Sequence, residues 1–438
     1  MKYRLNKSLL FIALLIIAKC SEAQPDSLFP KVQPAIFSLS DILDSIDARN
    51  PGLQQFDYKA QASYARGEAA RSWAPPSAGI GLSEFPYSAA STMDGNGSTS
   101  RKMLMLRLQQ MFPNFSRQRK EQAVHRSYAQ QYQDDRETMK NRLFAKAKLA
   151  YYDTYTAAKK IKVIGEQQKQ LKLLIQIAEG RLAYGKARLA NIYKARAKLS
   201  DLTSMKIKLQ SMHDQAVAVL NSLMNLPIDA SLQLDTATAV MEQHADILQV
   251  DSSYIQKHRS DIQHIGDEIH SMRLKQEVVS AERKPTFGLS FDNMRMPVRM
   301  EGKNSSMYMY NVMAMVSIPI APWFSKGYKA EARSIDDQIH AMQKMQDGQV
   351  HEVIGNIRKD WLRLQSARKD LNIFQSQVIP AYGKVFQSNL NAFSENTGDI
   401  YETLSAWDEL TMKKLTYYDK LETLLNIQVM LETEMQAY

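Results

Sequence analysis

The sequence repeats itself at a spacing of about 210 residues, and this duplication restricts the architectures open to the chain. Pro75 corresponds to Pro285, and a Pro-x-Phe-Ser-basic motif occurs at 113–117 and again at 322–326. Further pairs at nearly the same spacing are Met103 with Met313, Met105 with Met315, and Tyr151 with Trp361. Solenoid repeats span only about 20–50 residues, so a unit this long predicts a duplicated half and not an array.

Hydrophobic periodicity predicts the same series in each half: a helix, two strands, a very long helix, a tight break and a second long helix. For the first half, residues 24–227, we expect strands at about 77–87 and 101–111 and long helices at about 116–183 and 187–225. For the second half, residues 251–438, we expect strands at about 285–298 and 306–319 and long helices at about 325–393 and 399–436, with a linker at 228–250. The helix at 116–183 would be about 100 Å long, which favours coiled-coil packing.

The junction after the last strand combines a strand stop with a helix start. Pro319 and Pro322 end the alternating run, because proline donates no hydrogen bond to a sheet. Ser325 is expected to cap the helix that follows.

The predicted strands alternate between apolar and other side chains. Leu104, Leu106 and Leu108 share one face, while Met103 and Met105 lie on the other. Hairpins with one apolar side and strands of about ten residues are typical of membrane β-barrels. Four strands cannot close a barrel in lipid. The sequence therefore predicts a mainly α protein with a membrane β-barrel, in which three copies supply twelve strands.

The first residues, 1–23, have the features of a secretory signal peptide. Basic residues precede an apolar run from Leu9 to Ala18 that is too short to span a bilayer. Cys20 is the only cysteine, and it is either a lipidation site or is removed with the signal peptide.

The chain carries a net charge of +10, which raises the possibility of nucleic-acid binding. Lys and Arg are interleaved with Asp and Glu along the predicted helices, as on solvated faces. The signal peptide also argues against a nucleic-acid partner. We find no Ser-His-Asp set, phosphate-binding loop or cysteine cluster, so no enzyme, catalytic residue or cofactor is expected.

Together these features resemble the TolC-type outer-membrane efflux proteins over essentially all of the mature chain. The most specific motifs are Asn50-Pro51, the repeated Pro-x-Phe-Ser-basic junction, Arg181 to Gly185 with Ala195, and Ala218 to Met224 before Leu226-Pro227. The second tip departs from the family, because Asn396 stands where glycine is usual. Asn tolerates the left-handed conformation, so the turn is expected to survive.

The resemblance implies a homotrimer with a twelve-strand barrel in the outer membrane of a Gram-negative bacterium and an α-helical tunnel in the periplasm. It implies the exit duct of a tripartite efflux pump, with an inner-membrane transporter, a periplasmic adaptor (membrane fusion) protein and outer-membrane lipid as partners. The alternatives are a periplasmic coiled-coil scaffold or adaptor and, among ducts, a protein-secretion or general drug efflux channel.

The resemblance also assigns roles to residues at the helix–helix turns. In the family these turns contact the adaptor, and here they are Tyr184, Gly185, Lys186, Asn396, Thr397 and Gly398. An acidic ring that narrows the family's tunnel corresponds to Glu402, and its aromatic neighbour to Phe393. The alternative for Glu402 is a solvated acid near a helix N-terminus.

Methionines recur on the predicted non-lipid face of the strands. They are Met103, Met105, Met294, Met296, Met307, Met309, Met313 and Met315. Thioethers favour soft Cu(I), so this face suits a copper or silver exporter, and heavy-metal efflux is one branch of the family. The alternative is that methionine fills gaps in a narrow interior, as it does in protein cores.

Overall fold

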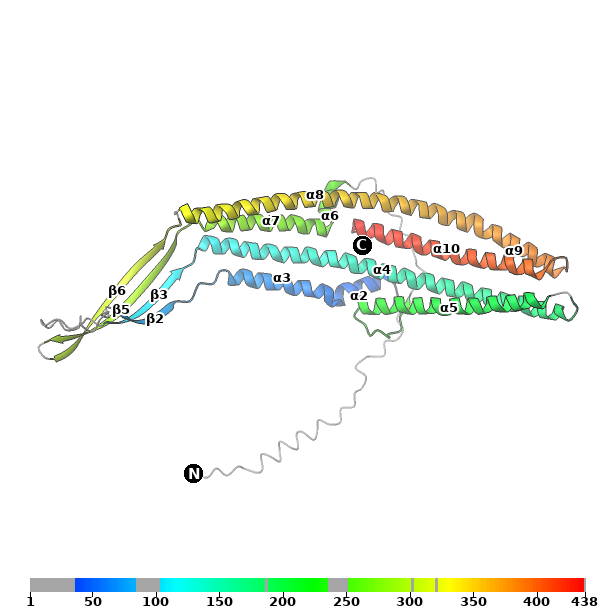
Figure 1. The fold of residues 1–438 in the computed structure, drawn as a ribbon, viewed down its shortest axis with the longest axis horizontal. Helices are drawn as coiled ribbons and strands as arrows, with labels where there is room; N and C mark the ends of the chain where they lie inside the picture. Colours follow the sequence, from blue (N-terminus) through cyan, green and yellow to red (C-terminus); the bar gives the residue numbers. More distant parts are fainter. Residues whose placement is uncertain are drawn as a thin grey trace, which may run out of the picture.

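The computed structural model describes residues 36–83, 103–185, 188–234, 251–300, 303–319 and 322–436. The expected signal peptide, the loop at 88–100 and Lys186 lie outside these ranges. The molecule is elongated, with a sheet at one end and long helices running to two turns at the other end (Figure 1). In these ranges we find no helix that is both long and apolar enough to cross a membrane.

The first half begins with two short helices and continues into the sheet. Its elements are α2 (Leu39–Arg49), α3 (Pro51–Ala69), β2 (Ser77–Ser83), β3 (Met103–Phe112), α4 (Phe115–Leu182) and α5 (Leu189–Leu223). Asn50 caps α3 through its side chain, and Pro51 occupies the first helical position, where its missing N–H costs nothing. Asn114 caps α4, accepting from the Arg117 amide at 3.1 Å.

The second half follows the same order with more interruptions. Its elements are α6 (Ser252–His258), α7 (Ser260–Ala281), β5 (Thr286–Met300), β6 (Lys303–Ser317), α8 (Pro322–Ile373), α9 (Ile379–Ser394) and α10 (Ile400–Met435). The sequence predicted that Ser325 is the N-cap of α8. This prediction is wrong, because the helix already begins at Pro322.

The long helix expected at 325–393 is not regular. A π-helical turn, Phe374–Val378, separates α8 from α9. Pro380 lies just beyond it, has no N–H to donate and would clash with the carbonyl four residues earlier. The wider π turn places one extra residue at this point, which explains why the second half is interrupted where α4 is not.

The main sheet joins the two halves. Its strand order is β2-β3-β5-β6, and all neighbours are antiparallel. The sheet is open, with β2 and β6 as its edges, so this chain alone does not form a closed barrel. A second, parallel pair was not foreseen from the sequence: β1 (Ile36–Phe37) pairs with β4 (Gln233–Leu234).

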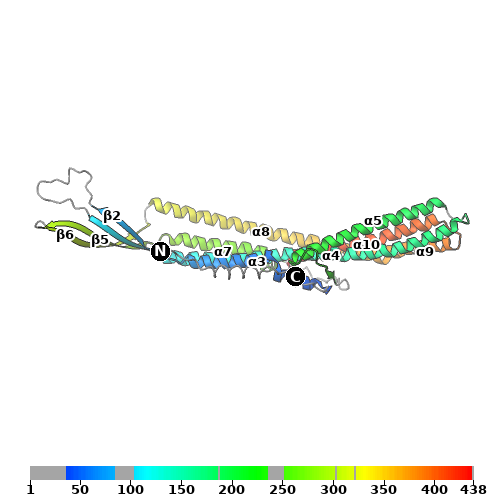
Figure 2. The same ribbon diagram turned by 90° about the horizontal axis from the view of Figure 1, so that it is seen from below.

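The helices pack as a long, thin layer in which α4 contacts α3, α5, α7 and α10. Figure 2 shows α5 and α10 close to α4 and α9 at the end far from the sheet. Buried apolar residues are spread along this layer, with Trp407 fully buried near the turns and Ile42 fully buried near the middle. Large apolar side chains stay exposed on its faces, including Leu173 at 58% and Ile207 at 63%. These faces fit packing against further helices.

Buried ion pairs join α4 to α10. Lys148 contacts Glu432 at 2.6 Å, with both side chains nearly inaccessible. Lys160 contacts Asp419 at 2.6 Å and Glu422 at 2.7 Å. Burial by itself lowers the pKa of Lys160, but its hydrogen bonds to these two carboxylates raise it on balance. The two cations therefore set the register between the helices.

A buried carboxyl group lies between α4 and α7. Asp134 is 5% exposed, and Gln130 donates to it at 3.4 Å. Burial, together with the charge and hydrogen bond of Asp267 on α7, raises the pKa of Asp134 to about 7, and burial contributes most. Gln130 and His264 act in the opposite direction. The folded chain therefore holds a proton here that the unfolded chain loses near pH 4.

Stability should consequently depend on pH through this group. Because the folded state binds the proton more tightly, unfolding free energy is expected to fall as pH rises from about 4 to about 7. Asp134→Asn should remove this loss. The unfolding free energy of the variant relative to that of the wild type should therefore be higher at pH 8 than at pH 5, by on the order of 2 kcal/mol. Denaturant unfolding followed by circular dichroism at both pH values tests this, with the exposed Asp44→Asn as the control. Equal pH dependence in wild type and Asp134→Asn would contradict it.

Candidate functional sites on the sheet and at the helical turns

One face of the sheet is apolar and exposed. Directly paired residues of antiparallel strands point to the same side, so the register assigns each face. The exposed fractions of Ile80, Leu106 and Tyr310 are 74%, 52% and 77%. The same face carries Ala78, Leu82, Leu104, Leu108, Phe112, Phe287, Leu289, Phe291, Tyr308, Val312, Ala314 and Val316, and also the polar side chains of Gln110, Asn293 and Arg295. A largely apolar exposed face of this size marks an interaction surface, and an apolar phase such as lipid fits it.

The opposite face gathers the methionines that the sequence singled out. Met105, Met294 and Met309 form one row across three strands. Met296 is paired with Met307, and Met313 with Ser290. The eight predicted methionines therefore share one face, and Met103 is the most buried of them, at 6% exposure.

The structure adds Met111, which the sequence analysis did not include. It is paired with Gly288, which is also paired with Met315. A side chain at Gly288 would place its Cβ 2.4 Å from the Met111 sulfur, so glycine leaves room for these thioethers. The alternation from Met103 to Gln109, extended by one step, would have identified Met111.

A single ion pair lies among the methionines. Arg107 Nε contacts Asp292 Oδ1 at 2.7 Å, and its Nη2 contacts Oδ2 at 3.2 Å. Asn311 is paired with Asp292 in the register and completes the row. Asp292 is 1% exposed, and the guanidinium neutralises its charge in a bidentate contact. The centre of this face is therefore neutral and rich in thioethers, while the register places Lys303 on it at the hairpin end.

The first helical turn ends α4 and leads into α5. Gly185 has a φ of +68°, a conformation that glycine adopts without strain. Tyr184 is 82% exposed, so its ring projects from the end of the molecule. The sequence placed Tyr184 and Gly185 at a turn, and the structure has them there.

The second turn is built around the residue that departs from the family pattern. Asn396 has a φ of +61°, so it occupies the left-handed conformation that the sequence analysis expected it to tolerate. The amides of Thr397 and Gly398 both donate to the carbonyl of Ala392, at 2.9 and 3.0 Å. A Cβ at Gly398 would lie 3.0 Å from that of Ala392, which explains the glycine at this second position.

An arginine joins the two turns. Arg181, at the end of α4, donates to the carbonyls of Phe393 at 2.6 Å and Ser394 at 3.2 Å. Its guanidinium also lies 4.1 Å from the centre of the Phe393 ring. A cation at the last carbonyls of α9 interacts favourably with the helix dipole. Arg181 therefore fixes the two turns to each other, a role that the sequence analysis missed because the partner is 212 residues away.

The two residues proposed for a gate lie in different environments. Phe393 is 2% exposed and belongs to the apolar core beneath Arg181. Glu402 is exposed in the first turn of α10, three residues after the N-cap Asp399. The Glu402 carboxylate is therefore accessible from outside the chain, whereas the Phe393 ring is packed in the core.

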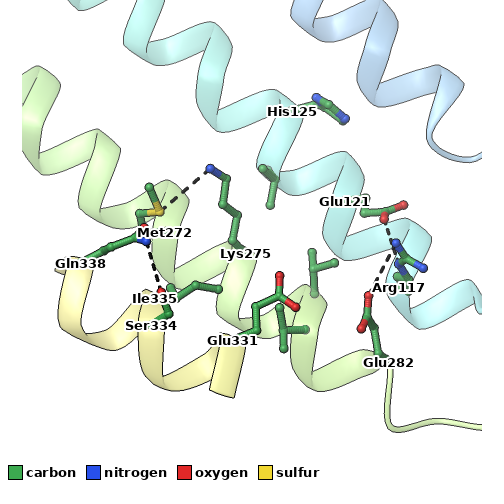
Figure 3. Close-up of a pocket in the computed structure, with 13 residues that line it drawn as sticks. Arg117, Glu121, His125, Met272, Lys275, Glu282, Glu331, Ser334, Ile335 and Gln338 are labelled. Atoms are coloured by element: carbon green, nitrogen blue, oxygen red, sulfur yellow. Dashed lines mark hydrogen bonds and ion pairs between the residues drawn. The ribbon is translucent and has the colours of Figure 1, made fainter. Parts of the chain in front are cut away.

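A cavity of about 500 Å³ lies between α4, α7 and α8 near the sheet. Arg117 is its main charged contact, with Glu121 at 2.9 Å and Glu282 at 3.6 Å (Figure 3). Lys275 points toward Met272 on the same helix. Three of the charged groups drawn around this cavity, Arg117, Glu121 and Glu282, are joined by ion pairs, which fits a packing gap between helices.

No protein-family model matches the sequence, and neither does a curated protein. Solved structures do match it. The outer-membrane channel OprN has a TM-score of 0.71 at 17% identity, covering 96% of this chain and 95% of that chain. The chain has the fold of an outer-membrane channel.

Two further solved structures agree with this channel fold. CusC, described for its folding and transmembrane channel formation, has a TM-score of 0.71 at 15% identity and covers 93% of this chain and 95% of that chain. The open state of the Neisseria gonorrhoeae MtrE outer membrane channel has a TM-score of 0.68 at 15% identity, covering 91% and 88%. The single-chain fold implied by the resemblance to TolC-type proteins is confirmed, while the twelve-strand barrel and the trimer stay predictions.

Proposed function

We propose that three copies of this chain form the exit duct of a tripartite efflux pump in the outer membrane of a Gram-negative bacterium. The observation that carries the proposal is the open sheet, with its exposed apolar face and its two unpaired edges, β2 and β6. Backbone groups at a free edge cannot be left unpaired in lipid. Pairing β6 of one copy with β2 of the next would satisfy them and turn the apolar face outward.

Aromatic residues at the helical end of the apolar face support a membrane position. At the helical end Trp73 packs edge-on against Phe112 and Phe115, each at 5.8 Å between ring centres. Amphipathic aromatic rings collect at the two borders of a bilayer, and membrane barrels carry such girdles.

The turns far from the sheet are proposed to contact the periplasmic adaptor. The contacting residues would be Tyr184, Gly185, Lys186, Asn396, Thr397 and Gly398. The exposed Tyr184 ring supports this, because aromatic side chains are enriched at protein interfaces. An inner-membrane transporter would hand substrates to the duct through the same assembly.

Glu402 is proposed as the residue that narrows the closed duct, with Phe393 holding the turn through Arg181. Three carboxylates around an axis repel one another and attract cations. In planar bilayers, Glu402→Ala is expected to raise single-channel conductance and lower cation selectivity, most clearly at low salt, where screening is weak. Glu409→Ala, an exposed acid on the same helix, is the control. Unchanged conductance in Glu402→Ala removes the gate role, and the absence of any wild-type channel contradicts the duct.

The face of the sheet that carries the methionines is proposed as a path for soft cations such as Cu(I) or Ag(I). Leucine matches methionine in volume but lacks sulfur, so replacing Met105, Met294 and Met309 together with leucine should preserve packing. A deletion strain complemented with this variant is expected to grow less well on copper and silver than one with the wild-type chain. Tolerance to zinc, cobalt, bile salts and hydrophobic drugs should be unchanged.

Other outcomes of that growth assay separate the alternatives. If both strains tolerate copper and silver equally, the methionines do not serve as a path for soft cations and only fill gaps in the interior. If deletion of the chain itself causes sensitivity only to detergents and drugs, the duct serves general efflux. A deletion strain that tolerates every compound points to protein secretion.

A further inference from the structure

Basic residues outnumber acidic ones in the parts of the helices that lie next to the sheet. The four 12-residue segments next to the sheet are 63–74, 115–126, 273–284 and 322–333. They contain 13 Lys and Arg and 5 Asp and Glu, while the whole chain has 56 and 46. We call this set of basic residues the basic collar. The four segments carry a net charge of +8, and residues 159–208, toward the helical turns, carry a further +10.

The basic collar surrounds the base of the sheet. The segments are the C-terminal ends of α3 and α7 and the N-terminal ends of α4 and α8, all of which meet the strands (Figure 1). The aromatic border of the apolar face lies between the collar and the strands, and Trp323 at the start of α8 is 83% exposed. Apolar face, aromatic border and positive charge therefore follow one another along the molecule.

Helix stability favours the basic residues at the C-terminal ends of α3 and α7, but it does not explain those at the starts of α4 and α8. The N-terminus of a helix carries partial positive charge, so basic residues there are unfavourable. Neither α4 nor α8 has an acidic residue in its first turn. Arg117, Arg119 and Lys326 occupy the starts of these helices instead.

Much of this charge is also left without an acidic partner. Arg117 is neutralised by Glu121 and Glu282 in the cavity described above (Figure 3). Arg119, by contrast, donates to the carbonyl of Phe115 at 3.4 Å, and Lys284 donates to the Ser116 hydroxyl at 2.9 Å. Because Phe115 and Arg119 are four residues apart, they share the face of α4 that carries the aromatic border.

We infer that the basic collar binds the headgroups of anionic phospholipids in the leaflet on the helical side of the membrane. This inference rests on the proposed duct, which places the apolar face in lipid. Basic clusters beside a membrane-embedded segment attract anionic lipids, at about 1 kcal/mol for each Lys or Arg near the surface. A phospholipid is the partner that fits, because the collar directly follows the apolar face. A lipid whose acyl chain covers that face has its headgroup at the collar.

Tryptophan quenching by brominated lipids measures this preference. Trp73 and Trp323 lie at the aromatic border, whereas Trp407, near the helical turns, is fully buried. The assembled full-length protein would be placed in phosphatidylcholine–phosphatidylglycerol vesicles in which either one lipid or the other is brominated. We expect brominated phosphatidylglycerol to quench more than brominated phosphatidylcholine, and the difference to disappear at high salt.

Charge removal gives the second test. The double variant Arg119→Gln, Lys329→Gln should lower the preference for phosphatidylglycerol by about two- to fivefold per charge, the range for one exposed charge. The control removes the same charge from exposed positions far from the sheet, as Lys172→Gln, Lys208→Gln, and should leave the preference unchanged.

The outcomes distinguish this inference from the proposed duct. Equal quenching of the wild type by both brominated lipids at low salt overturns the inference but leaves the membrane position intact. Quenching by neither lipid overturns both. If both double variants lose the preference equally, net charge and not the collar is responsible, and the inference fails. The salt series on the wild type keeps the test valid if a variant does not assemble.

Discussion

Lys148→Ala is expected to destabilise the helical part of the molecule by about 3–5 kcal/mol. The Lys148 and Glu432 side chains are only 11% and 7% exposed, and they meet at 2.6 Å. Removing the ammonium leaves the Glu432 carboxylate in a poorly solvated place without Lys148, although Gln428 Nε2 still donates to it at 2.9 Å. Most of the loss would come from keeping this carboxylate buried without its cation, since well-packed apolar residues replace such a pair at little cost.

Denaturant unfolding of the purified chain measures the change, and two variants act as controls. Lys148→Met with Glu432→Leu removes both charges and should recover most of the stability, because no charge remains buried. Lys344→Ala breaks the ion pair with Asp347, in which both side chains are more than half exposed, and should cost less than about 1 kcal/mol. A similar small loss for Lys148→Ala would show that this pair contributes no more than a surface one.

Leu106→Lys is expected to impair membrane insertion, with a cost of about 2–4 kcal/mol if the residue lies near the bilayer midplane. Leu106 is central in β3, paired with Ile80 on one side and Asn293 on the other, and it is 52% exposed on the apolar face. In a membrane barrel this side chain would meet lipid, where an ammonium group has no partner.

Heat-stable trimer in outer-membrane fractions is the measurement, with Gln109→Lys as the matched control. Gln109 lies on the same strand but on the methionine-bearing face, where a charge would meet water. Leu106→Lys should reduce the trimer strongly, and Gln109→Lys should leave it near wild type. Equal amounts of trimer in both variants would argue against an outward apolar face.

Local sequence patterns account for the elements and for the turns. The change of period from 3.6 to 2 and back again located the strands close to their observed bounds, because each period reports on one face of one element. Asn396 shows the same locality: its short polar side chain tolerates the left-handed conformation wherever the rest of the chain lies. The Ser325 cap failed for a local reason too, since Pro322 could already begin the helix.

From the sequence, the candidate site on the sheet could be predicted only one strand at a time, without the pairing between strands. Alternation placed eight methionines on one side of their strands, but the row of Met105, Met294 and Met309 depends on how β3 meets β5. The same pairing brings Arg107 to Asp292, 185 residues away. No spacing in the sequence indicates that contact.

The sequence by itself determined the duplicated halves, the apolar face of each strand and the positions of the helical turns, because these follow from neighbours along the chain. Only the tertiary structure decided which distant residues meet. Lys148 finds Glu432 across 284 residues, and Arg181 finds the end of α9 across 212. It also gathered the basic collar, because two helices end and two begin at the base of the sheet. Each of these depends on how the helices pack against one another and against the sheet, which is a property of the whole fold.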